Sequence, residues 1–348
     1  MNRILPAIVF VVVLAIGIGM TLMVYRAEEA ANRARFEIVA GESADRIRDQ
    51  VRQHVALVSA TGAFMNAHPG VVTRPAFDTF VGGIGRAGDF DGLRGIGYAR
   101  LINTGDEALA EADLADSYDL QRRVWPETTD QAWRTPIVLL SPDDMRNHVA
   151  LGFDMFSEAT RRAAMQAALD SGEMRVSAPV ELVQEITEDK QAGFLVYIPY
   201  TDIPANVLAS ARTPVPVAGF VYAPFRAGDL HIAALSRTAE MPVVVETFDT
   251  TDGGKTLLYR SSDFAQQSAR SAYGVDRSFE IGGRQWTVTI RETAQFGGAN
   301  EWLNTFVLGA ISLLLAAALA TSTWFQSKPS PPPKSCMRFM RNRCRRRT

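Results

Sequence analysis

Residues 4–25, ILPAIVFVVVLAIGIGMTLMVY, form a run of 22 positions without a charged side chain. A second uncharged run, residues 302–325 (WLNTFVLGAISLLLAAALATSTWF), lies near the other end of the chain. About 20 apolar residues in a helix cross the roughly 30 Å hydrocarbon core of a membrane. The sequence therefore predicts two transmembrane helices, 4–25 and 302–325, with one large domain tethered between them.

Basic residues around these runs predict how the chain is oriented. Residues 326–348 contain eight lysines and arginines and no acid, and Arg3 precedes the first run. Such residues stay on the cytoplasmic side, so residues 1–3 and 326–348 are predicted to be cytoplasmic. The 276 residues between the runs are then extracytoplasmic, which is periplasmic for a bacterial inner (plasma) membrane. All 38 acids and 27 of the 36 bases lie there, giving that part a net charge of −11.

A cleaved signal peptide is the alternative for the first run. Its 22 apolar residues exceed the roughly 7–15 of a signal-peptide core, although small residues do follow at Ala27, Ala30 and Ala31. The only cysteines, Cys336 and Cys344, lie in the tail, so the domain is predicted to fold without disulfides. The tail itself is short, basic and proline-rich. Its last, basic residues are expected to lie against anionic lipid. Its prolines are expected to form a disordered stub or, alternatively, to present a polyproline ligand to a cytoplasmic partner.

A stalk helix is predicted for residues 26–70. Apolar residues at 47, 51, 55 and 58 repeat at the spacing of one helix face, and residues 26–68 contain no proline. This stripe either packs against its own domain or forms a homodimer with a second copy, because the periodicity fits both.

The remainder of the domain has the pattern of a mixed α/β fold with two sheet-and-helix units, 71–215 and 216–292. Residues 157–171 predict a helix that ends at Gly172, and residues 175–180 and 193–200 predict a strand pair. Prolines 204, 214 and 216 suggest a boundary, after which residues 217–223 predict the first strand of the second unit. Gly282 and Gly283 between two alternating runs predict a hairpin turn.

Several blocks of this domain, in this order, resemble the CHASE domain, the extracytoplasmic sensory module of bacterial and plant receptors that include the cytokinin receptors. The blocks are 72–77 (VTRPAF), 96–99 (IGYA), 152–154 (GFD), 161–163 (RRA), 177–180 (SAPV), 193–199 (GFLVYIP), 217–226 (VAGFVYAPFR) and 282–286 (GGRQW). The resemblance covers residues 71–290. It implies a stalk helix that carries two PAS-like antiparallel sheet units, flanked by the two transmembrane helices.

The resemblance also implies a small-molecule ligand in the membrane-distal unit, and a movement of the spans that signals across the membrane. It places the ligand near Tyr98, Asp154, Arg161, Ser177, Val183 and Tyr197. Arg161 stands where plant receptors have an aspartate that hydrogen-bonds the adenine ring. A cation cannot replace a carboxylate acceptor. If Arg161 faces the pocket, an anionic small molecule therefore fits better than a cytokinin; otherwise Arg161 and Arg162 form a solvated helix face.

Catalytic chemistry is not predicted. The four histidines, at 54, 68, 148 and 231, all lie between the spans, which leaves no cytoplasmic histidine to accept a phosphoryl group. Asp143, Asp144 and His148 could form a metal site, but the polar, proline-containing context favours a surface loop. We expect no enzyme activity, no cofactor, no metal and no nucleic-acid partner.

The functional hypothesis is a membrane-anchored sensor without a catalytic output domain of its own, which acts through a cytoplasmic or membrane signalling partner. A truncated receptor is a variant of this hypothesis. The alternative from another class is a structural or protein-interaction module whose pocket is filled by its own side chains.

Overall fold

The computed structural model describes residues 4–68, 71–87, 92–185, 190–201, 217–236, 241–296 and 301–327. Residues 1–3, the three prolines taken as a boundary and the tail from 328 onward lie outside these ranges. The chain divides into two compact units: a helical unit, Met1–Arg35 with Gly297–Thr348, and an α/β unit, Phe36–Phe296.

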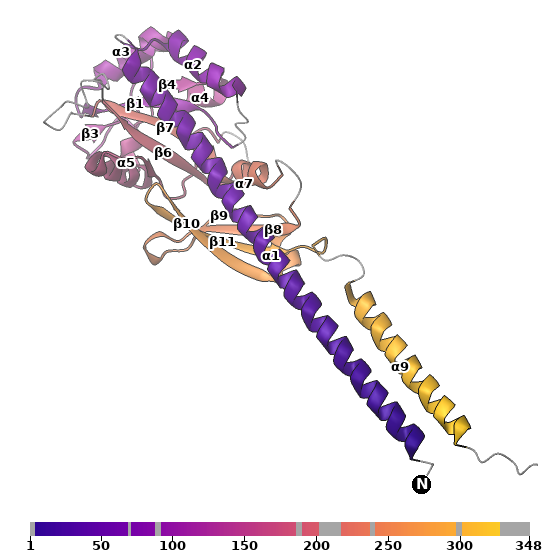
Figure 1. Cartoon of the computed structure of the whole chain (residues 1–348). Coiled ribbons are helices and arrows are strands. Elements are labelled where there is room, and N and C mark those ends of the chain that lie inside the picture. Colours follow the sequence, from indigo (N-terminus) through magenta and orange to yellow (C-terminus); the bar gives the residue numbers. More distant parts are fainter. Residues whose placement is uncertain are drawn as a thin grey trace, which may run out of the picture. The chain divides into compact units, whose positions relative to one another are not determined.

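The helical unit consists of α9 (Glu301–Gln326) and the first part of α1 (Leu5–Ala67), which lie side by side (Figure 1). Both helices are long and apolar enough to cross a membrane. They approach closely where a Cβ atom added to Gly17 would lie 2.5 Å from the Cβ atom of Ser312. Small residues allow this kind of close packing between apolar helices. Nearer the start of α9, Thr305 Oγ1 donates a hydrogen bond of 3.1 Å to Glu28 Oε2 of α1.

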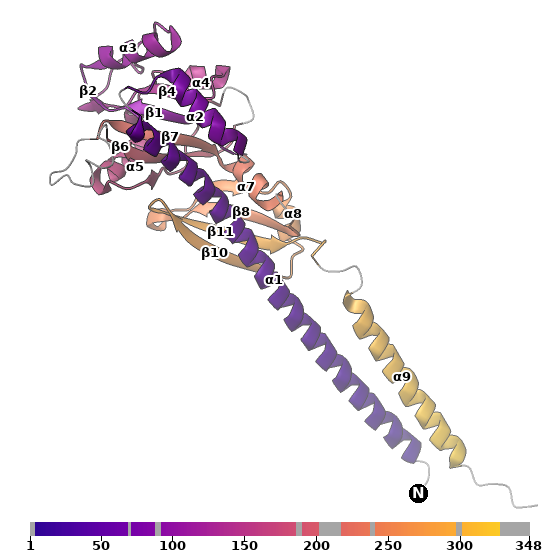
Figure 2. The same cartoon turned by 45° about the horizontal axis from the view of Figure 1, so that its top comes forward.

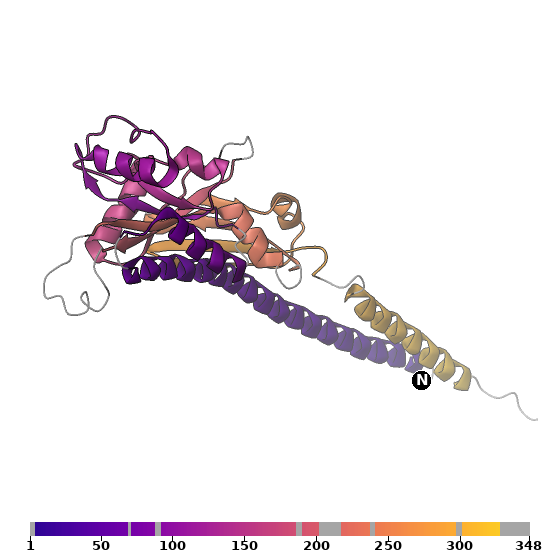
Figure 3. The same ribbon diagram turned by 90° about the horizontal axis from the view of Figure 1, so that it is seen from above.

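The later part of α1 belongs to the α/β unit and lies along one side of its strands (Figure 3). One face of the helix is buried, at the positions Phe36, Ala40, Ser43, Ala44, Ile47, Gln50, Val51, His54, Val58, Thr61 and Met65. The stripe predicted from the sequence thus packs against its own domain, which was one of the two alternatives. Each large apolar side chain buried in this way contributes about 1.5–3 kcal/mol.

The first sheet has five antiparallel strands in the order β4-β1-β7-β6-β5. Strands β4, β1, β7 and β6 are labelled in Figure 2. Their bounds are β1 Ile96–Arg100, β4 Ile137–Ser141, β5 Arg175–Val176, β6 Gly193–Tyr200 and β7 Gly219–Arg226. β7 pairs with both β1 and β6, with Tyr222 opposite Gly97 and Tyr197. The prediction that a second unit begins at residue 216 is therefore wrong. The strand after the prolines completes the first sheet, since its hydrogen-bonding partners are strands of that sheet.

The second sheet has four antiparallel strands in the order β10-β11-β8-β9. Their bounds are β8 Val243–Asp249, β9 Thr256–Arg260, β10 Gly274–Ile281 and β11 Arg284–Glu292. Gly282 and Gly283 join β10 to β11 with φ angles of 52° and 80°. Two successive residues with positive φ make the tight turn that suits the twist of a hairpin, so the predicted turn is confirmed.

Helices and short elements cover the sheets and connect them. They are α2 Arg74–Ala87, α3 Glu107–Tyr118, α4 Met145–Ala150, α5 Ala159–Ser171, α7 Ala227–Ser236, α8 Phe264–Ser268, the 3-10 turns η1 Met155–Ser157 and η2 Thr251–Gly253, and a two-stranded sheet of β2 Ile102–Asn103 with β3 Trp133–Arg134. The predicted helix at 157–171 begins two residues later, because the Glu158 carboxylate caps it by accepting from the N–H groups of Thr160 and Arg161. Gly172 ends it in the left-handed conformation, as predicted.

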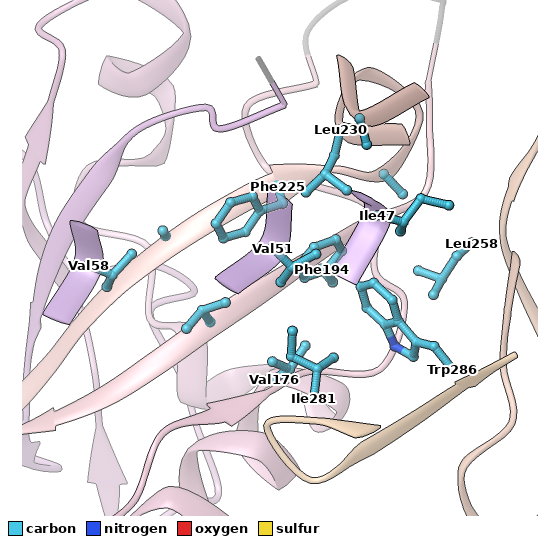
Figure 4. Packing of buried hydrophobic residues seen from close by; sticks show 14 of the residues in the cluster. Ile47, Val51, Val58, Val176, Phe194, Phe225, Leu230, Leu258, Ile281 and Trp286 are labelled. Carbon is cyan, nitrogen blue, oxygen red and sulfur yellow. The ribbon is translucent and has the colours of Figure 1, made fainter. Parts of the chain in front are cut away.

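A single hydrophobic core joins α1 to both sheets (Figure 4). Trp286 of β11 belongs to this core and is fully buried, with its ring centroid 5.0 Å from that of Phe194 in β6. Ile47 and Val51 of α1 reach the same cluster. The fold class expected from the sequence, a long N-terminal helix with antiparallel sheets and two apolar helices, is confirmed. The two sheets share this core, to which the first sheet contributes the face that is turned to α1.

His231 of α7 gives this unit a pH-dependent stability. The ring is fully buried, with Nδ1 2.6 Å from the Ala227 carbonyl oxygen and Nε2 2.9 Å from Thr247 Oγ1. Burial lowers the pKa of His231 to about 4, whereas an unfolded histidine has a pKa of about 6.5. The unfolded state therefore binds the proton first. The contribution to stability is complete above pH 6.5 and is lost as the pH falls toward 4.

We expect His231 to reduce the free energy of unfolding by about 2 kcal/mol between pH 7.5 and pH 5. Urea unfolding followed by circular dichroism at both pH values, on the full chain and on His231→Gln, measures this contribution. Other titrating groups affect both proteins equally, so the variant should show the smaller pH dependence. An identical pH dependence in the two proteins would contradict the assignment.

Candidate functional site

The candidate site lies on the face of the first sheet that is turned away from α1. Along β6 and β7, the side chains of Tyr197 and Tyr222 point to this face, where they pack in a core with η1 and α5. Five of the six residues predicted from the sequence are located in or beside this core, which we call the tyrosine cluster. They are Asp154, Arg161, Ser177, Val183 and Tyr197.

Tyr98 is the exception, because it lies on the opposite face of the sheet. Its ring packs edge-on against Tyr200 at 5.4 Å, and its hydroxyl donates to the Ala218 carbonyl oxygen at 3.1 Å. There it lines a separate cavity of about 310 Å³ beside Met65 and Val72. Successive residues of a strand point to opposite faces. The preceding residue, Gly97, is therefore the one that faces the tyrosine cluster.

Asp154 is fully buried, and both oxygens of its carboxylate accept hydrogen bonds from other residues of the chain. Its Oδ2 accepts from Arg134 Nε at 3.0 Å, and its Oδ1 accepts from the N–H groups of Thr135 at 2.8 Å and Phe156 at 3.0 Å. Arg134, with 2% of its side chain exposed, also donates to Glu107 Oε1 at 3.0 Å. These bonds fix the start of η1 beneath the sheet.

Arg161 faces the cluster and is not part of a solvated helix face, since only 5% of it is exposed. Its guanidinium donates to Glu158 Oε2 at 3.2 Å and to the Glu181 carbonyl oxygen at 2.7 Å, and lies 5.5 Å from the centre of the Phe153 ring. Burial raises the pKa of Glu158, but hydrogen bonds from Thr160 and Arg161 outweigh it and lower the pKa overall. The charge of Arg161 is thus already paired with a carboxylate.

Tyr197 and Tyr222 form the centre of the cluster, with ring centroids 6.4 Å apart and neither side chain exposed. Burial raises the pKa of both hydroxyls, so both are neutral donors at physiological pH. Tyr197 Oη lies 3.7 Å from Met155 Sδ, a weak acceptor. Among the described residues, Tyr222 Oη has no hydrogen-bond partner. A buried hydroxyl without a partner costs about 1–3 kcal/mol and is uncommon in folded proteins.

Ser177 and Val183 border the cluster. Ser177 Oγ accepts from the Leu195 N–H at 3.0 Å and donates to the Ala178 carbonyl oxygen at 2.8 Å, which holds the chain after β5 against β6. Val183 is half-buried and packs against the same core. Ser177 therefore uses its hydroxyl within the protein, as Asp154 uses its carboxylate.

Sequence reasoning missed two residues of the cluster, Arg134 and Tyr222. Tyr222 could have been found, because it alternates with Phe220 along β7 and so points to the same face. Nothing in the sequence marks Arg134 as the partner of Asp154, since 20 residues separate them.

The three polar residues considered as a metal site lie at the surface. Asp143 contacts both His148 Nε2 and the Arg74 guanidinium, and Asp144 caps α4 by accepting from the Asn147 N–H at 2.8 Å. Within the part of the chain that the structure describes, no three histidine, cysteine, aspartate or glutamate residues are grouped as metal ligands would be.

Comparison with known proteins gives a curated relative that is named as a signal transduction kinase. The hybrid signal transduction histidine kinase A of Dictyostelium discoideum is 24% identical over 213 residues, which cover 55% of this chain and 10% of that protein. The chain thus spans about a tenth of the length of this relative.

Two solved structures are similar at low identity. An extracellular ligand binding receptor from Desulfohalobium retbaense has a TM-score of 0.45 and 9% identity, with 74% of this chain and 40% of the other covered. The periplasmic sensory domain of the Campylobacter jejuni chemoreceptor Tlp1 has a TM-score of 0.41 and 8% identity, with 74% and 92% covered.

The resemblance carried by the sequence blocks is confirmed by a family model. The model of the CHASE domain matches residues 70–259, which is more than half of the chain and includes all but the last of those blocks. The chain therefore belongs to the CHASE domain family.

Proposed function

We propose that this chain is a two-pass membrane sensor whose CHASE domain binds a small molecule at the tyrosine cluster and signals across the membrane. The family supports an extracytoplasmic sensory role. The observation that carries the binding proposal is the buried hydroxyl of Tyr222, which has no partner among the described residues, whereas Asp154 and Ser177 form hydrogen bonds within the protein. A polar group of a ligand placed between Tyr197 and Tyr222 would satisfy both hydroxyls.

The class of ligand follows from the charges around the cluster. An anion would have to compete with Glu158 for Arg161, since these two side chains are already paired at 3.2 Å. We therefore place an uncharged hydrogen-bonding group of the ligand on the tyrosine hydroxyls, which modifies the expectation of an anionic ligand. Because Tyr197 and Tyr222 are fully buried, entry requires that η1 and the start of α5 move away from the sheet.

The route of the signal is part of the same proposal. The domain is extracytoplasmic and both termini are cytoplasmic, as the basic flanks of the apolar runs favour. Strand β11 ends at Glu292, and α9 begins at Glu301, so a change in the sheets is passed along a short connection to the second apolar helix. The receiver is a signalling partner in or below the membrane, and the protein itself is non-catalytic. Homodimerisation through α1 stays a prediction.

The closed packing of the cluster favours a second candidate function. A structural or interaction module would have a site filled by its own side chains, and Tyr197 and Tyr222 are both fully buried in the core that they form with η1 and α5. On this alternative the domain binds no metabolite.

A thermal-shift screen of the full chain in lipid nanodiscs against a metabolite library decides between the two. For a sensor we expect a compound that raises the unfolding temperature by about 5 °C or more at a hundredfold excess over its dissociation constant. Tyr222→Phe should then raise that constant about tenfold, through loss of one hydrogen bond, without lowering stability.

Tyr200→Phe is the matched control, because it removes a hydroxyl from the opposite face of the same sheet. It should leave the dissociation constant unchanged. A screen in which no compound shifts the wild type would support the structural module, and a compound that binds Tyr222→Phe as tightly as wild type would remove the tyrosine cluster as its site.

A further inference from the structure

A second cavity, separate from the tyrosine cluster, lies between α2 and the ends of β1 and β4. Its volume is about 450 Å³, within the range of small-molecule sites. Val81 of α2, Leu93 and Ile96 supply apolar walls. Ile96 belongs to the core on the α1 side of the first sheet, so this cavity and the tyrosine cluster lie on different faces.

The polar group that points to a ligand is the side-chain amide of Gln184. This residue lines the cavity, is only 7% exposed, and makes no side-chain hydrogen bond with another described residue. The side-chain amide of Asn147, which also lines the cavity, does have a hydrogen-bond partner. Asn147, 2% exposed, donates from Nδ2 to the Pro142 carbonyl oxygen at 2.8 Å and so fixes the cavity wall. A buried amide normally finds such partners, and the cavity is where those of Gln184 would bind.

The charges that line the cavity favour an anion. Arg146 makes no ion pair with any described residue. Arg94 pairs through Nη2 with Asp229 at 2.6 Å, while its buried Nε has no hydrogen-bond partner in the part of the chain that the structure describes. The one lining acid, Asp144, is engaged as the cap of α4, where its Oδ1 accepts from the Asn147 N–H. Guanidinium groups bind carboxylates in preference to neutral oxygens.

We infer that this cavity is a second small-molecule site, which takes an organic carboxylate with an apolar body. The carboxylate would contact Arg146 and the Gln184 amide, and the apolar body would lie against Val81, Leu93 and Ile96. The inference is independent of the tyrosine cluster, because no residue is shared by the two sites.

Equilibrium dialysis of radiolabelled hexanoate against the full chain in nanodiscs, with empty nanodiscs subtracted, tests the site. We expect saturable binding of one hexanoate per chain, with the uncharged hexanamide competing at least tenfold more weakly. Arg146→Gln should weaken hexanoate binding about tenfold, since it removes the charge of the cation and keeps its polarity.

Two glycines of α2 provide a matched pair of variants. A Cβ atom at either Gly82 or Gly83 would meet no other atom within 4 Å, so both positions accept a side chain. Of these two glycines, Gly82 lines the cavity and Gly83 does not. Gly82→Leu should therefore fill it and abolish hexanoate binding, whereas Gly83→Leu should leave binding intact. A thermal melt of each variant shows that it is folded.

Several results would overturn the inference. Absence of saturable hexanoate binding to the wild-type chain would do so, and so would equal affinity in the wild type, Arg146→Gln and Gly82→Leu. Loss of hexanoate binding in Tyr222→Phe but not in Gly82→Leu would place the carboxylate in the tyrosine cluster instead. If the metabolite screen found no compound that binds at the tyrosine cluster and hexanoate still bound, only the proposed function would be contradicted.

Discussion

Trp286→Ala is expected to lower the free energy of unfolding by about 3–5 kcal/mol. Trp286 is the largest fully buried side chain among the described residues, and it contacts Phe194 at 5.0 Å and Phe279 at 6.0 Å between ring centroids. The substitution removes a large apolar surface and leaves a cavity between the two sheets and α1 (Figure 4). Urea unfolding of the full chain, followed by circular dichroism, measures the loss.

Trp133→Ala is the matched control, because Trp133 belongs to the short strand β3 and is 41% exposed. We expect that substitution to cost about 1 kcal/mol or less, the usual range for surface positions. Equal losses for the two tryptophans would show that the shared core does not hold the sheets together.

Asp154→Asn is expected to cost about 3 kcal/mol. Removing one partner of a buried ion pair leaves the other charge poorly compensated, at a cost of about 3–5 kcal/mol. Arg134 keeps its second carboxylate, Glu107 at 3.0 Å, which places the expected loss at the lower end. The same unfolding experiment measures it. Because Asp154 holds η1, loss of ligand binding at the tyrosine cluster should accompany the loss of stability.

The control makes the same chemical change in a half-exposed pair. Asp113→Asn removes the carboxylate that Arg100 contacts at 2.7 Å, where both side chains are about one-third exposed. Solvent screens this pair, so we expect a cost of about 1 kcal/mol or less. If Asp154→Asn lowered the free energy of unfolding no more than Asp113→Asn, the buried ion pair of Arg134 and Asp154 would not be what fixes the start of η1.

Features that depend on neighbours in sequence could be predicted. The helix stripe at Ile47, Val51 and Val58, the Gly172 cap and the hairpin at Gly282 and Gly283 each follow from a few adjacent residues. Their conformations are set by local periodicity and by backbone angles that glycine adopts at little cost. The family resemblance, carried by the order of such blocks, was predicted on the same basis and is confirmed.

The candidate site could be predicted only in part. Asp154, Arg161, Ser177, Val183 and Tyr197 do come together, but the partners that occupy Asp154 and Arg161 were not foreseen. Tyr98 was placed with them although strand alternation turns it to the other face. The cavity beside α2 could not be predicted from the sequence, because the residues that line it come from four separate segments of the chain.

The sequence by itself determined that two apolar runs bracket an acidic, disulfide-free domain with a long helix and hairpins, because composition and local periodicity are sufficient for these features. Only the tertiary structure decided that β7 completes the first sheet and that one face of α1 is buried against its own domain. It also decided which buried polar groups have no partner among the described residues. Those outcomes depend on pairings between residues as far apart as Tyr98 and Val221. Such pairings are selected by the burial of the whole core, and no short stretch of the chain specifies them.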